Sequence, residues 1–500
     1  MSGISKAFGA VQANRGISLR LASGEVLGLL GENGAGKTTL MKILYGLTPA
    51  DAGEIRINGR AMRFHSPRDA IAQGIGMVHQ HFMLVQSHTV AENVALGFAG
   101  APFFQPARAV AKKIEEFSRR YGLAVDPQAR IWQLSAGEQQ RVEIVKALLA
   151  GASLLILDEP TSVLTPREAG ELFAVLRRMA AEGHSIVFIS HKLEETLSLC
   201  DRVVVLRRGE VAGEAPAGQV DKRELARMMV GREVIFNLER KRLEPGPVVL
   251  EVEELTVAGD RGETAVRGLS FRIHRNEIFG IAGVSGNGQR ELVEAITGLR
   301  RVSSGTVRLE GRDVTNASAR VVAGRGLAHV PEERIRFGIV PNLVVYENSV
   351  LKRHRNRGFS RLLFLNYGSI RAHASDLVKD FSINVPSLNA PARVLSGGNI
   401  QKLILGREIS GEPSLLVASH PTYGLDVGAT EYIRRRLLER RERGSAVLLV
   451  SEDLEEIFEL ADRIGVLFAG RLMGIVPAEQ ATMEEIGLMM AGSRASEAAP

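Results

Sequence analysis

The sequence predicts an α/β protein made of two similar halves, each with a parallel β-sheet covered by helices. Short β-branched runs, such as residues 187–189 and 203–205, alternate with helical stretches, which is typical of such sheets. A glycine-rich loop at residues 31–38 lies between an apolar, strand-like run and a stretch with helical periodicity. Related motifs recur in the second part of the chain, so the same fold is expected twice.

The glycine-rich loop fits the phosphate-binding pattern G-x-x-x-x-G-K-[ST] and has the strand before it and the helix after it that this pattern requires. Glycines allow successive N–H groups to converge on an anion at the positive end of a helix. Lys37 would bridge the β- and γ-phosphates, and the Thr38 hydroxyl would hold Mg²⁺. A glycine-rich turn that binds nothing is the alternative, and the strand and helix argue against it. The predicted nucleotide-binding residues of this loop are Gly31, Asn33, Gly34, Gly36, Lys37, Thr38 and Thr39.

The two halves are repeats of one another. Gly28 to Gly36 recurs as Gly280 to Gly288, and Leu134-Ser135 recurs as Leu395-Ser396, with nine extra residues in the second half between these motifs. The predicted domains are residues 1–231 and 248–500, joined by a charged, proline-bearing linker at 232–247. Residues 248–252 align to positions before Met1. We therefore expect that the first half lacks an edge strand or that its start codon lies upstream.

Composition narrows the functional classes. Five hundred residues are enough for two or three domains, and 45% hydrophobic with 24% charged residues is ordinary for a soluble globular protein. A net charge of +6 favours neither nucleic acid nor lipid as a partner. Cys200 is the sole cysteine, which rules out an internal disulfide and fits a reducing compartment. No signal-peptide core and no run of 18 apolar residues occurs, so a cytoplasmic location is expected.

Three motifs together resemble those of the ATP-binding cassette family. They are Leu-Ser-Ala-Gly-Glu at 134–138, the apolar run ending in Asp-Glu-Pro-Thr at 154–161, and His191. The resemblance covers nearly the whole chain, twice. It implies an ATPase with ATP and Mg²⁺ as cofactors and two tandem P-loop NTPase domains, each a RecA-like core with an antiparallel β subdomain and a helical subdomain. In that family two cassettes pack head to tail, so each ATP lies between the glycine loop of one and the LSGG signature of the other.

The resemblance also assigns roles to single residues. Asp158 would hold Mg²⁺ through water, and Glu159 would polarise the attacking water. Gln80 matches the glutamine that senses Mg²⁺ and the membrane partner, His191 matches the histidine that contacts the γ-phosphate, and Phe8 would stack on adenine. Each has a purely structural explanation when taken alone, but the joint pattern favours the catalytic one.

The second half has the same order of motifs but lacks the residue types that ATP hydrolysis requires. The residues that replace Lys37, Thr38, Gln80, Asp158, Glu159 and His191 are Gln289, Arg290, Glu332, Ser419, His420 and Glu452, respectively. No aromatic residue occurs in 256–270, where the equivalent of Phe8 is expected. Glu332 and Glu452 would repel a γ-phosphate. His420 as a substitute base, and nucleotide binding at the second loop, both stay open.

The second signature is intact, and the resemblance implies that it completes the first half's ATP site. Its predicted nucleotide-binding residues are Ser396, Gly397, Gly398 and Gln401. One ATP site is therefore expected to be whole, and the other is expected to be unable to hydrolyse.

Fused cassettes with one degenerate site resemble the ATPase subunit of bacterial importers for simple sugars and nucleosides. This implies two transmembrane permease subunits, an extracytoplasmic solute-binding protein, no nucleic acid, and a peripheral position on the inner face of the cell membrane. Permease coupling helices would sit in grooves near Gln80 and Glu332. The alternative is a soluble twin-cassette ATPase acting on ribosomes, but the linker lacks polybasic character. A third interpretation, a P-loop kinase, does not account for the two signature motifs. The arginines at 434–436 and 440–441 are predicted to form a solvated helix face.

Overall fold

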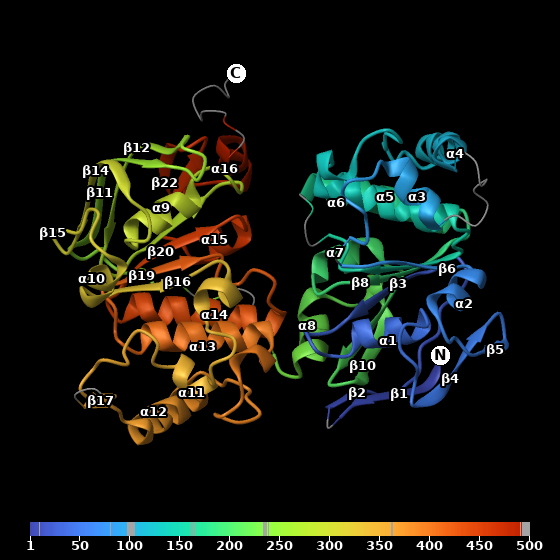
Figure 1. Ribbon diagram of the computed structural model, residues 1–500, viewed down its shortest axis with the longest axis horizontal. Coiled ribbons are helices and arrows are strands. Elements are labelled where there is room, and N and C mark those ends of the chain that lie inside the picture. Colours follow the sequence, from blue (N-terminus) through green and yellow to red (C-terminus); the bar gives the residue numbers. More distant parts are fainter. Residues whose placement is uncertain are drawn as a thin grey trace. The chain divides into compact units, whose positions relative to one another are not determined.

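The chain folds into two units with the same order of elements (Figure 1). The first comprises Met1–Val234 with Asp426–Gly428, and the second comprises Ile235–Leu425 and Ala429–Pro500. The computed structural model describes residues 1–9, 11–80, 82–97, 106–161, 164, 166–233, 238, 240–361, 364–490 and 492. The division between the units falls inside the predicted linker, of which residues 234–237 and 239 lie outside the described part.

The first unit contains two sheets. The antiparallel sheet has the order β2-β1-β4-β5, with strands β1 (Ser2–Phe8), β2 (Val11–Ile17), β4 (Ala52–Ile57) and β5 (Arg60–Met62). The core sheet has the order β10-β9-β3-β8-β7-β6, with strands β3 (Val26–Leu30), β6 (Ile75–Val78), β7 (Leu154–Asp158), β8 (Ser185–Ile189), β9 (Arg202–Arg207) and β10 (Glu210–Pro216). Its strands are parallel except for the edge strand β10. Every residue of β3 is buried, as expected for a strand with both faces covered.

Helices cover the core sheet of the first unit. They are α1 (Lys37–Leu44), α2 (Pro67–Ala72), α3 (Val90–Gly97), α4 (Pro106–Tyr121), η1 (Ile131–Gln133), α5 (Ala136–Leu149), α6 (Pro166–Ala181), α7 (Leu193–Leu199), η2 (Ala217–Gln219) and α8 (Lys222–Val230). One hydrophobic cluster joins the sheet to the helical side through residues such as Ile114, Val145 and Phe188. A second joins it to α1 and the antiparallel sheet through Ile4 and Leu40. The antiparallel sheet and helices α3 and α4 therefore lie at opposite ends of the unit (Figure 1).

The second unit repeats this plan. Its antiparallel sheet is β12-β11-β14-β15, with strands β11 (Val248–Ala258), β12 (Thr264–His274), β14 (Val302–Leu309) and β15 (Arg312–Asp313). Its core sheet is β16-β19-β20-β13-β21-β22, with strands β13 (Ile278–Ala282), β16 (Leu327–Val330), β19 (Leu415–Ser419), β20 (Ala446–Ser451), β21 (Arg463–Phe468) and β22 (Arg471–Pro477). A small hairpin, β17 (Ser360–Arg361) and β18 (Phe364–Leu365), is added.

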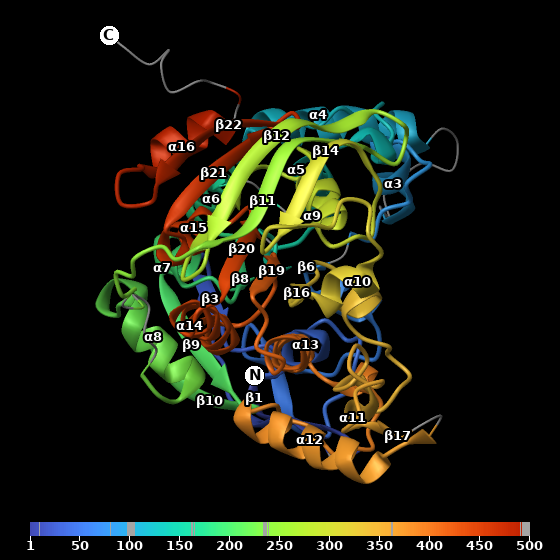
Figure 2. The ribbon, with the colours of Figure 1, turned by 90° about the vertical axis from the view of Figure 1, so that its left-hand side faces the viewer.

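The helices of the second unit occupy equivalent places. They are α9 (Gln289–Ile296), α10 (Ala319–Gly324), the π-helix η3 (Arg334–Gly338), α11 (Val345–Asn348), α12 (Tyr367–Asp380), η4 (Ala392–Val394), α13 (Gly397–Ile409), α14 (Val427–Glu442), α15 (Leu454–Leu460) and α16 (Met483–Met490). Figure 2 shows β11, β12 and β14 at one end of this unit and α11 and α12 at the other. The predicted α/β fold, with a core, an antiparallel β subdomain and a helical subdomain in each of two tandem domains, is confirmed.

Two expectations from the sequence can be compared with the structure. Of the two alternatives for the start of the first half, the absence of the strand is wrong: β1 is present and pairs Ile4 with Ile17, as β11 pairs Leu255 with Leu269, although β1 has seven residues and β11 has eleven. The other alternative, a start codon upstream, stays a prediction. The arginines of α14 do not form a solvated face. Arg441 is 1% exposed and its guanidinium donates to both carboxylate oxygens of Asp462 at 2.6 and 2.8 Å. Its partner lies 21 residues away, which helix periodicity does not reveal.

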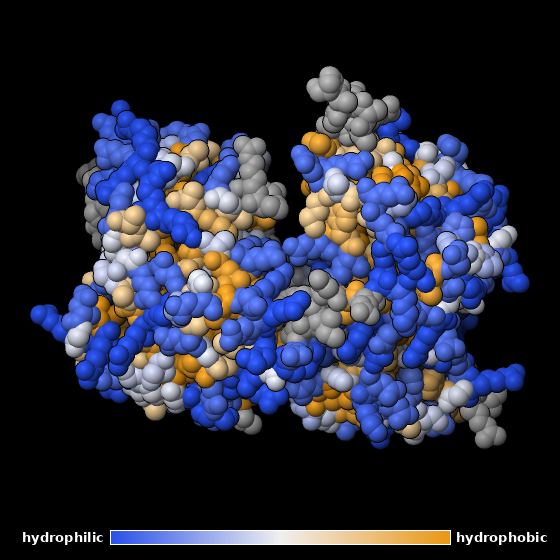
Figure 3. Space-filling view, turned by 180° about the vertical axis from the view of Figure 1, so that it is seen from behind, coloured by the Kyte–Doolittle hydropathy of each residue, from blue (hydrophilic) through white to orange (hydrophobic). Residues whose placement is uncertain are grey.

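On the face drawn in Figure 3, hydrophilic residues dominate both units and hydrophobic ones are scattered among them. No helix among the described residues is both long and apolar enough to cross a bilayer.

Candidate active site

The predicted catalytic segments of the first unit follow three neighbouring parallel strands. The phosphate loop comes after β3, Asp158 is the last residue of β7, and His191 comes two residues after β8. Strand β8 pairs with both β3 and β7. The carboxyl ends of parallel strands meet at one edge of a sheet, where α/β proteins place their ligands. Residues separated by more than 150 positions are thereby brought to one place.

The phosphate loop has the backbone geometry of an anion-binding site. Gly36 precedes the first residue of α1 with φ 102°, and a Cβ at this position would come within 2.3 Å of the Ala13 carbonyl oxygen. Only glycine fits both the left-handed conformation and this close approach. Lys37 Nζ donates to the carbonyls of Gly31 and Glu32 at 2.6 and 3.1 Å, so the ammonium group lies against the loop. Burial lowers the pKa of Lys37, although Glu159 and Asp158 oppose this shift.

Asn14 supports the loop from β2 and was not predicted from the sequence. It is fully buried, and its Nδ2 donates to the Gly36 carbonyl at 3.1 Å. In the second half Val266 occupies the corresponding position and packs beside Gly288. An asparagine 22 residues before Gly36 carries no local signal of this contact, and its replacement by Val266 in the second half is the trace of it in the sequence.

Thr38 and Asp158 form an oxygen-lined corner suited to a hard cation. The Thr38 hydroxyl donates to Asp158 Oδ1 at 3.4 Å, and Asp158 is 4% exposed at the end of β7. Burial raises the pKa of Asp158 above its ordinary value. No group of three His, Cys, Asp or Glu side chains gathers as a metal site within the described residues. A hydroxyl and a carboxylate fit Mg²⁺, which commonly uses few protein ligands together with water and substrate phosphates.

Glu159 is the centre of the predicted catalytic cluster. Its Oε2 accepts a hydrogen bond from Gln80 Nε2 at 3.0 Å, and its Oε1 lies 3.0 Å from His191 Nδ1. Burial opposes ionisation, but the hydrogen bond and charge of His191, together with Lys37, hold the pKa of Glu159 below its ordinary value. The structure thus brings Gln80, Glu159 and His191 together, with Glu159 in the ionised form that a general base requires.

Comparison with known proteins identifies the family. A family model described as ABC transporter matches residues 14–162 and 266–423, more than half of the chain. The chain belongs to the ABC transporter family. As a member, it is an ATPase with two ATP-binding cassettes.

The curated relatives match along their whole length. A glucose import ATP-binding protein of Haloferax volcanii is 48% identical, with 98% of this chain and 95% of the relative covered. A guanosine import ATP-binding protein of Bacillus subtilis is 46% identical, with 100% and 98% covered. A galactose/methyl galactoside import ATP-binding protein of Escherichia coli is 35% identical, with 97% and 96% covered.

Among solved structures, an RNase-L inhibitor superposes with a TM-score of 0.65 at 20% identity, over 98% of this chain and 93% of that one. An archaeal ribosome recycling factor, solved with a ribosomal stalk protein, gives 0.64 at 20% identity, over 98% and 92%. At this identity the likeness shows the fold and nothing more.

The second cassette has the same loop, but the two residues at its end, Gln289 and Arg290, are bonded within the cassette. Gln289 replaces the phosphate lysine, and its amide donates to the Val284 carbonyl at 3.0 Å and accepts from the Asn287 N–H at 3.1 Å. Arg290 turns away and pairs with Glu294 at 2.9 Å and Asp260 at 3.5 Å. The positive charge of Arg290 is therefore paired with these carboxylates.

The position of the predicted catalytic base has the same backbone geometry in both cassettes. Glu159 has φ 49° and its N–H donates to the Ile189 carbonyl; His420 has φ 45° and donates to the carbonyl of Val450. Ser419, which replaces Asp158, is buried and its hydroxyl has no hydrogen-bond partner among the described residues. The second cassette therefore keeps the backbone geometry of the first but lacks the carboxylate that is predicted to bind the metal.

The signature of the second cassette is well formed. Ser396 caps α13, accepting hydrogen bonds from the Asn399 N–H at 3.4 Å and from Asn399 Nδ2 at 2.9 Å, and Gly397 and Gly398 open the helix. Gln401 is 2% exposed and donates to the Pro421 carbonyl, which gives it a role in packing; its predicted contact with nucleotide stays a prediction. Arg334, which is not among the predicted site residues, donates to the carbonyls of Gly397 and Tyr423 and so joins the start of η3 to the start of α13 and to the turn at Tyr423.

The remaining predicted nucleotide-binding residues are Asn33, Thr39 and Phe8, whose roles stay predictions like those of the other site residues. Asn33 is exposed in the loop, and Thr39 lies in the first turn of α1. Phe8 ends β1, is 53% exposed, and has Lys6 Nζ 5.6 Å from the centre of its ring.

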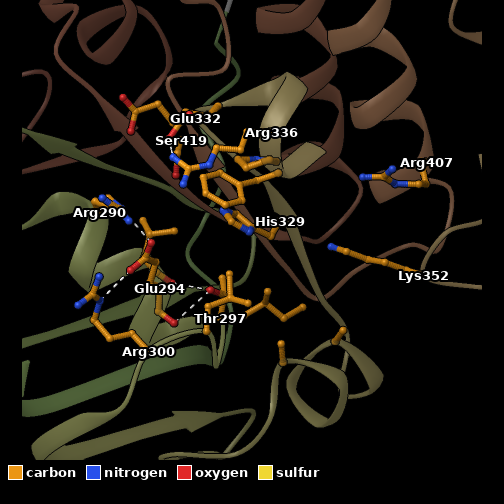
Figure 4. A pocket seen from close by; sticks show the side chains of 18 residues that line it. Arg290, Glu294, Thr297, Arg300, His329, Glu332, Arg336, Lys352, Arg407 and Ser419 are labelled. Atoms are coloured by element: carbon orange, nitrogen blue, oxygen red, sulfur yellow. Dashed lines mark hydrogen bonds and ion pairs between the residues drawn. The ribbon is translucent and has the colours of Figure 1, made fainter. Parts of the chain in front are cut away.

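A groove of about 730 Å³ opens in the second cassette between its core and its helical subdomain. Figure 4 shows Arg290 and Arg300 turned toward Glu294 on one side, Lys352 and Arg407 on the other, and His329 between them. Its apolar lining includes Val293, Leu299, Leu327 and Phe337, and Glu332 lies at its edge. Its volume is within the range of ligand and peptide sites.

Proposed function

We propose that the chain is the ATPase subunit of an ABC importer that takes up a nucleoside or a simple sugar through partner permeases. The observation that carries the proposal is the Gln80, Glu159 and His191 cluster beside the phosphate loop, in a chain whose full-length relatives are import ATP-binding proteins. The relatives' names mention glucose, guanosine and galactose, so the proposal includes both simple sugars and nucleosides as solutes.

In this proposal ATP is hydrolysed at the first cassette. Thr38, Asp158 and Gln80 would hold Mg²⁺, which when bound neutralises charge on the β- and γ-phosphates. Lys37 would contact the same phosphates, and Glu159 would accept the proton of the attacking water. His191 would contact the γ-phosphate, and Phe8 would stack on adenine. The second cassette lacks the lysine, the metal carboxylate and the base, so it is not expected to hydrolyse ATP.

The signature of the second cassette would complete the first cassette's site through Ser396, Gly397 and Gly398. Ser396→Arg tests this: a bulky cation at the cap should lower ATP turnover at least 100-fold. Ser135→Arg is the matched control, because Ser135 caps the equivalent helix α5 of the first cassette and would serve the degenerate site. Its turnover should stay within threefold of wild type. Equal losses in the two variants, or an unimpaired Ser396→Arg, would refute the composite site.

The partners follow from the importer assignment: two transmembrane permeases, an extracytoplasmic solute-binding protein and no nucleic acid. The groove beside Glu332 suits a permease coupling helix, because apolar side chains line it between charged walls. The chain would then act as a peripheral subunit on the inner face of the membrane.

The rival function is a twin-cassette ATPase on ribosomes. The linker argues against it, because the cations that nucleic acid would need are already paired: Lys241 with Glu442 at 2.7 Å and Arg242 with Glu479 at 2.8 Å. Uptake of radiolabelled guanosine, glucose and galactose in a deletion strain separates the two functions. Wild type should restore uptake of one solute and Glu159→Gln should not. Unchanged uptake in the deletion strain, with ribosomal RNA recovered alongside the tagged chain, would end the importer proposal.

A further inference from the structure

One basic segment of the second cassette is not used by any part of the proposed mechanism. Between Glu347 and Asp376 the sequence has six Lys or Arg residues and no Asp or Glu. The segment begins at Lys352 on the rim of the groove and runs through turns to the β17–β18 hairpin and α12. It includes much of the region in which the second half is longer than the first.

The turns are held in a defined conformation. The Asn356 N–H donates to the Arg353 carbonyl at 2.9 Å, and the Phe359 N–H donates to the Asn356 carbonyl at 2.8 Å. Phe359 packs on His373 of α12 with ring centroids 5.0 Å apart, and the Arg353 guanidinium lies 5.7 Å from the same phenyl ring. The backbone of this segment is therefore ordered, and so the positions of its exposed side chains are defined.

The outer cations lack the partners that cations elsewhere in this cassette have. Arg355 and Arg357 are exposed, and no ion pair or hydrogen bond of their side chains occurs in the part of the chain that the structure describes. By contrast, Arg434 pairs with Glu459, and Arg441 pairs with Asp462. Unpaired, clustered cations create a local positive potential that attracts an anionic surface.

Exposed apolar side chains follow these cations along the chain, on the β17–β18 hairpin and at the start of α12. The sequence at 362–365 is Leu-Leu-Phe-Leu, and of these Phe364 is 78% and Leu365 40% exposed. Tyr367 follows at 47% exposed. Exposing a phenylalanine and a leucine to water is unfavourable, by roughly 25 cal/mol for each Å² of apolar surface. Cations beside aromatic and aliphatic side chains are the composition that binds at membrane interfaces.

We propose that residues 352–361 and 364–367 form a lipid-contacting surface that binds anionic phospholipid headgroups and inserts Phe364 and Leu365 at the acyl boundary. Nucleic acid would also attract the cations, but it offers no apolar phase that could take up an exposed leucine such as Leu365. The surface acts independently of ATP, so it can be tested on the purified full chain without permeases.

The first experiment is sedimentation with vesicles of 30% phosphatidylglycerol in phosphatidylcholine, or of phosphatidylcholine alone. Binding to the anionic vesicles should be at least tenfold stronger and should weaken as NaCl rises from 50 to 300 mM. Arg355→Gln/Arg357→Gln should lower the anionic partition coefficient roughly tenfold to thirtyfold. The control Arg301→Gln/Arg312→Gln removes the same charge from two exposed positions of the same cassette, Arg301 just before β14 and Arg312 in β15, and should change the partition coefficient less than threefold. Neither pair should alter ATP turnover in solution.

The second experiment locates the contact. Trp132, in the first cassette, is the sole tryptophan and is 62% exposed, so the wild type reports on a site outside the segment. In Phe364→Trp/Trp132→Phe the sole tryptophan moves to the hairpin. Anionic vesicles should shift its emission to the blue, and brominated lipid should quench it, while wild-type emission stays unchanged.

Three results would overturn the proposal. The first is equal binding to neutral and anionic vesicles, and the second is an unshifted emission in Phe364→Trp/Trp132→Phe. The third is binding to RNA that Arg355→Gln/Arg357→Gln abolishes while vesicle binding is unaffected. Because ATP turnover is measured on the same variants, failure of the lipid surface and failure of the importer function are distinguishable.

Discussion

Replacing Glu159 by glutamine is the most direct test of the proposed chemistry. The carboxylate accepts a hydrogen bond from Gln80 Nε2 at 3.0 Å and lies 3.0 Å from His191 Nδ1. Glutamine keeps the shape of the side chain and removes its ability to accept a proton. We expect ATP binding to be preserved and hydrolysis to be almost lost.

The size of the loss follows from the two roles of the side chain. As a neighbour of Gln80 and His191, the amide can keep one of the two hydrogen bonds, so the structural cost is about 1 kcal/mol. As a general base, it contributes about 10²- to 10⁴-fold to the rate, or about 3 to 5 kcal/mol of barrier. The chemical loss is larger, so turnover should fall at least 100-fold while the thermal midpoint changes little.

The assay is steady-state phosphate release together with equilibrium binding of a fluorescent ATP analogue. Glu159→Asp provides a graded control, because its carboxylate is withdrawn by roughly 1.5 Å and a misplacement of that size costs about 10²-fold. His420→Ala changes the equivalent residue of the second cassette, and turnover should stay close to wild type. Turnover of Glu159→Gln within tenfold of wild type, or a 100-fold loss in His420→Ala, would refute this assignment of the base.

The ionisation of Glu159 also sets the sign of the pH dependence. Its pKa lies below the ordinary value of 4.5, because His191 and Lys37 outweigh the effect of burial. The base is therefore present across neutral pH and is lost only as pH falls through its lowered pKa. Turnover between pH 8 and pH 5 should show no acid limb from Glu159.

Three further predictions concern other parts of the chain. Lys37→Ala should weaken ATP binding at least tenfold in the same fluorescence assay, because the ammonium group lies against the loop where the phosphates bind; unchanged affinity would contradict the loop assignment. Glu408→Gln should lower the free energy of unfolding by about 3 kcal/mol in urea, because it leaves Arg407, 5% exposed and 2.9 Å away, as an uncompensated buried charge. The exposed Lys352, the other partner of Glu408, should matter little: Lys352→Gln is the control and should cost less than 1 kcal/mol. Cys200 is buried, which raises the pKa of its thiol, so labelling by a thiol reagent should be slow in the native chain and should speed up with unfolding of the first unit; rapid native labelling would contradict this burial.

The sequence by itself determined the fold class, the duplication and the asymmetry between the halves. These depend on local patterns: a glycine loop between a strand and a helix, and motifs repeated at a nearly constant distance. The exchange of Lys37 for Gln289 and of Asp158 for Ser419 is readable directly from the aligned halves. These motifs can be recognised without knowing the tertiary contacts, because the residues that set the backbone conformation of each motif lie within a few positions of one another.

Tertiary structure decided everything that depends on a distant partner. Asn14 supports the loop from 22 residues away, and Arg441, which helix periodicity placed in solvent, is buried against Asp462. Gln401 is buried and donates to the Pro421 carbonyl, a contact that the sequence does not show, and its contact with nucleotide stays a prediction. Arg355 and Arg357 have no partner among the described residues. A sequence shows which residues are charged but not which residues lie beside them in the folded protein. Whether a charge is paired or available depends on the distances that the folded chain sets, and so does its energy.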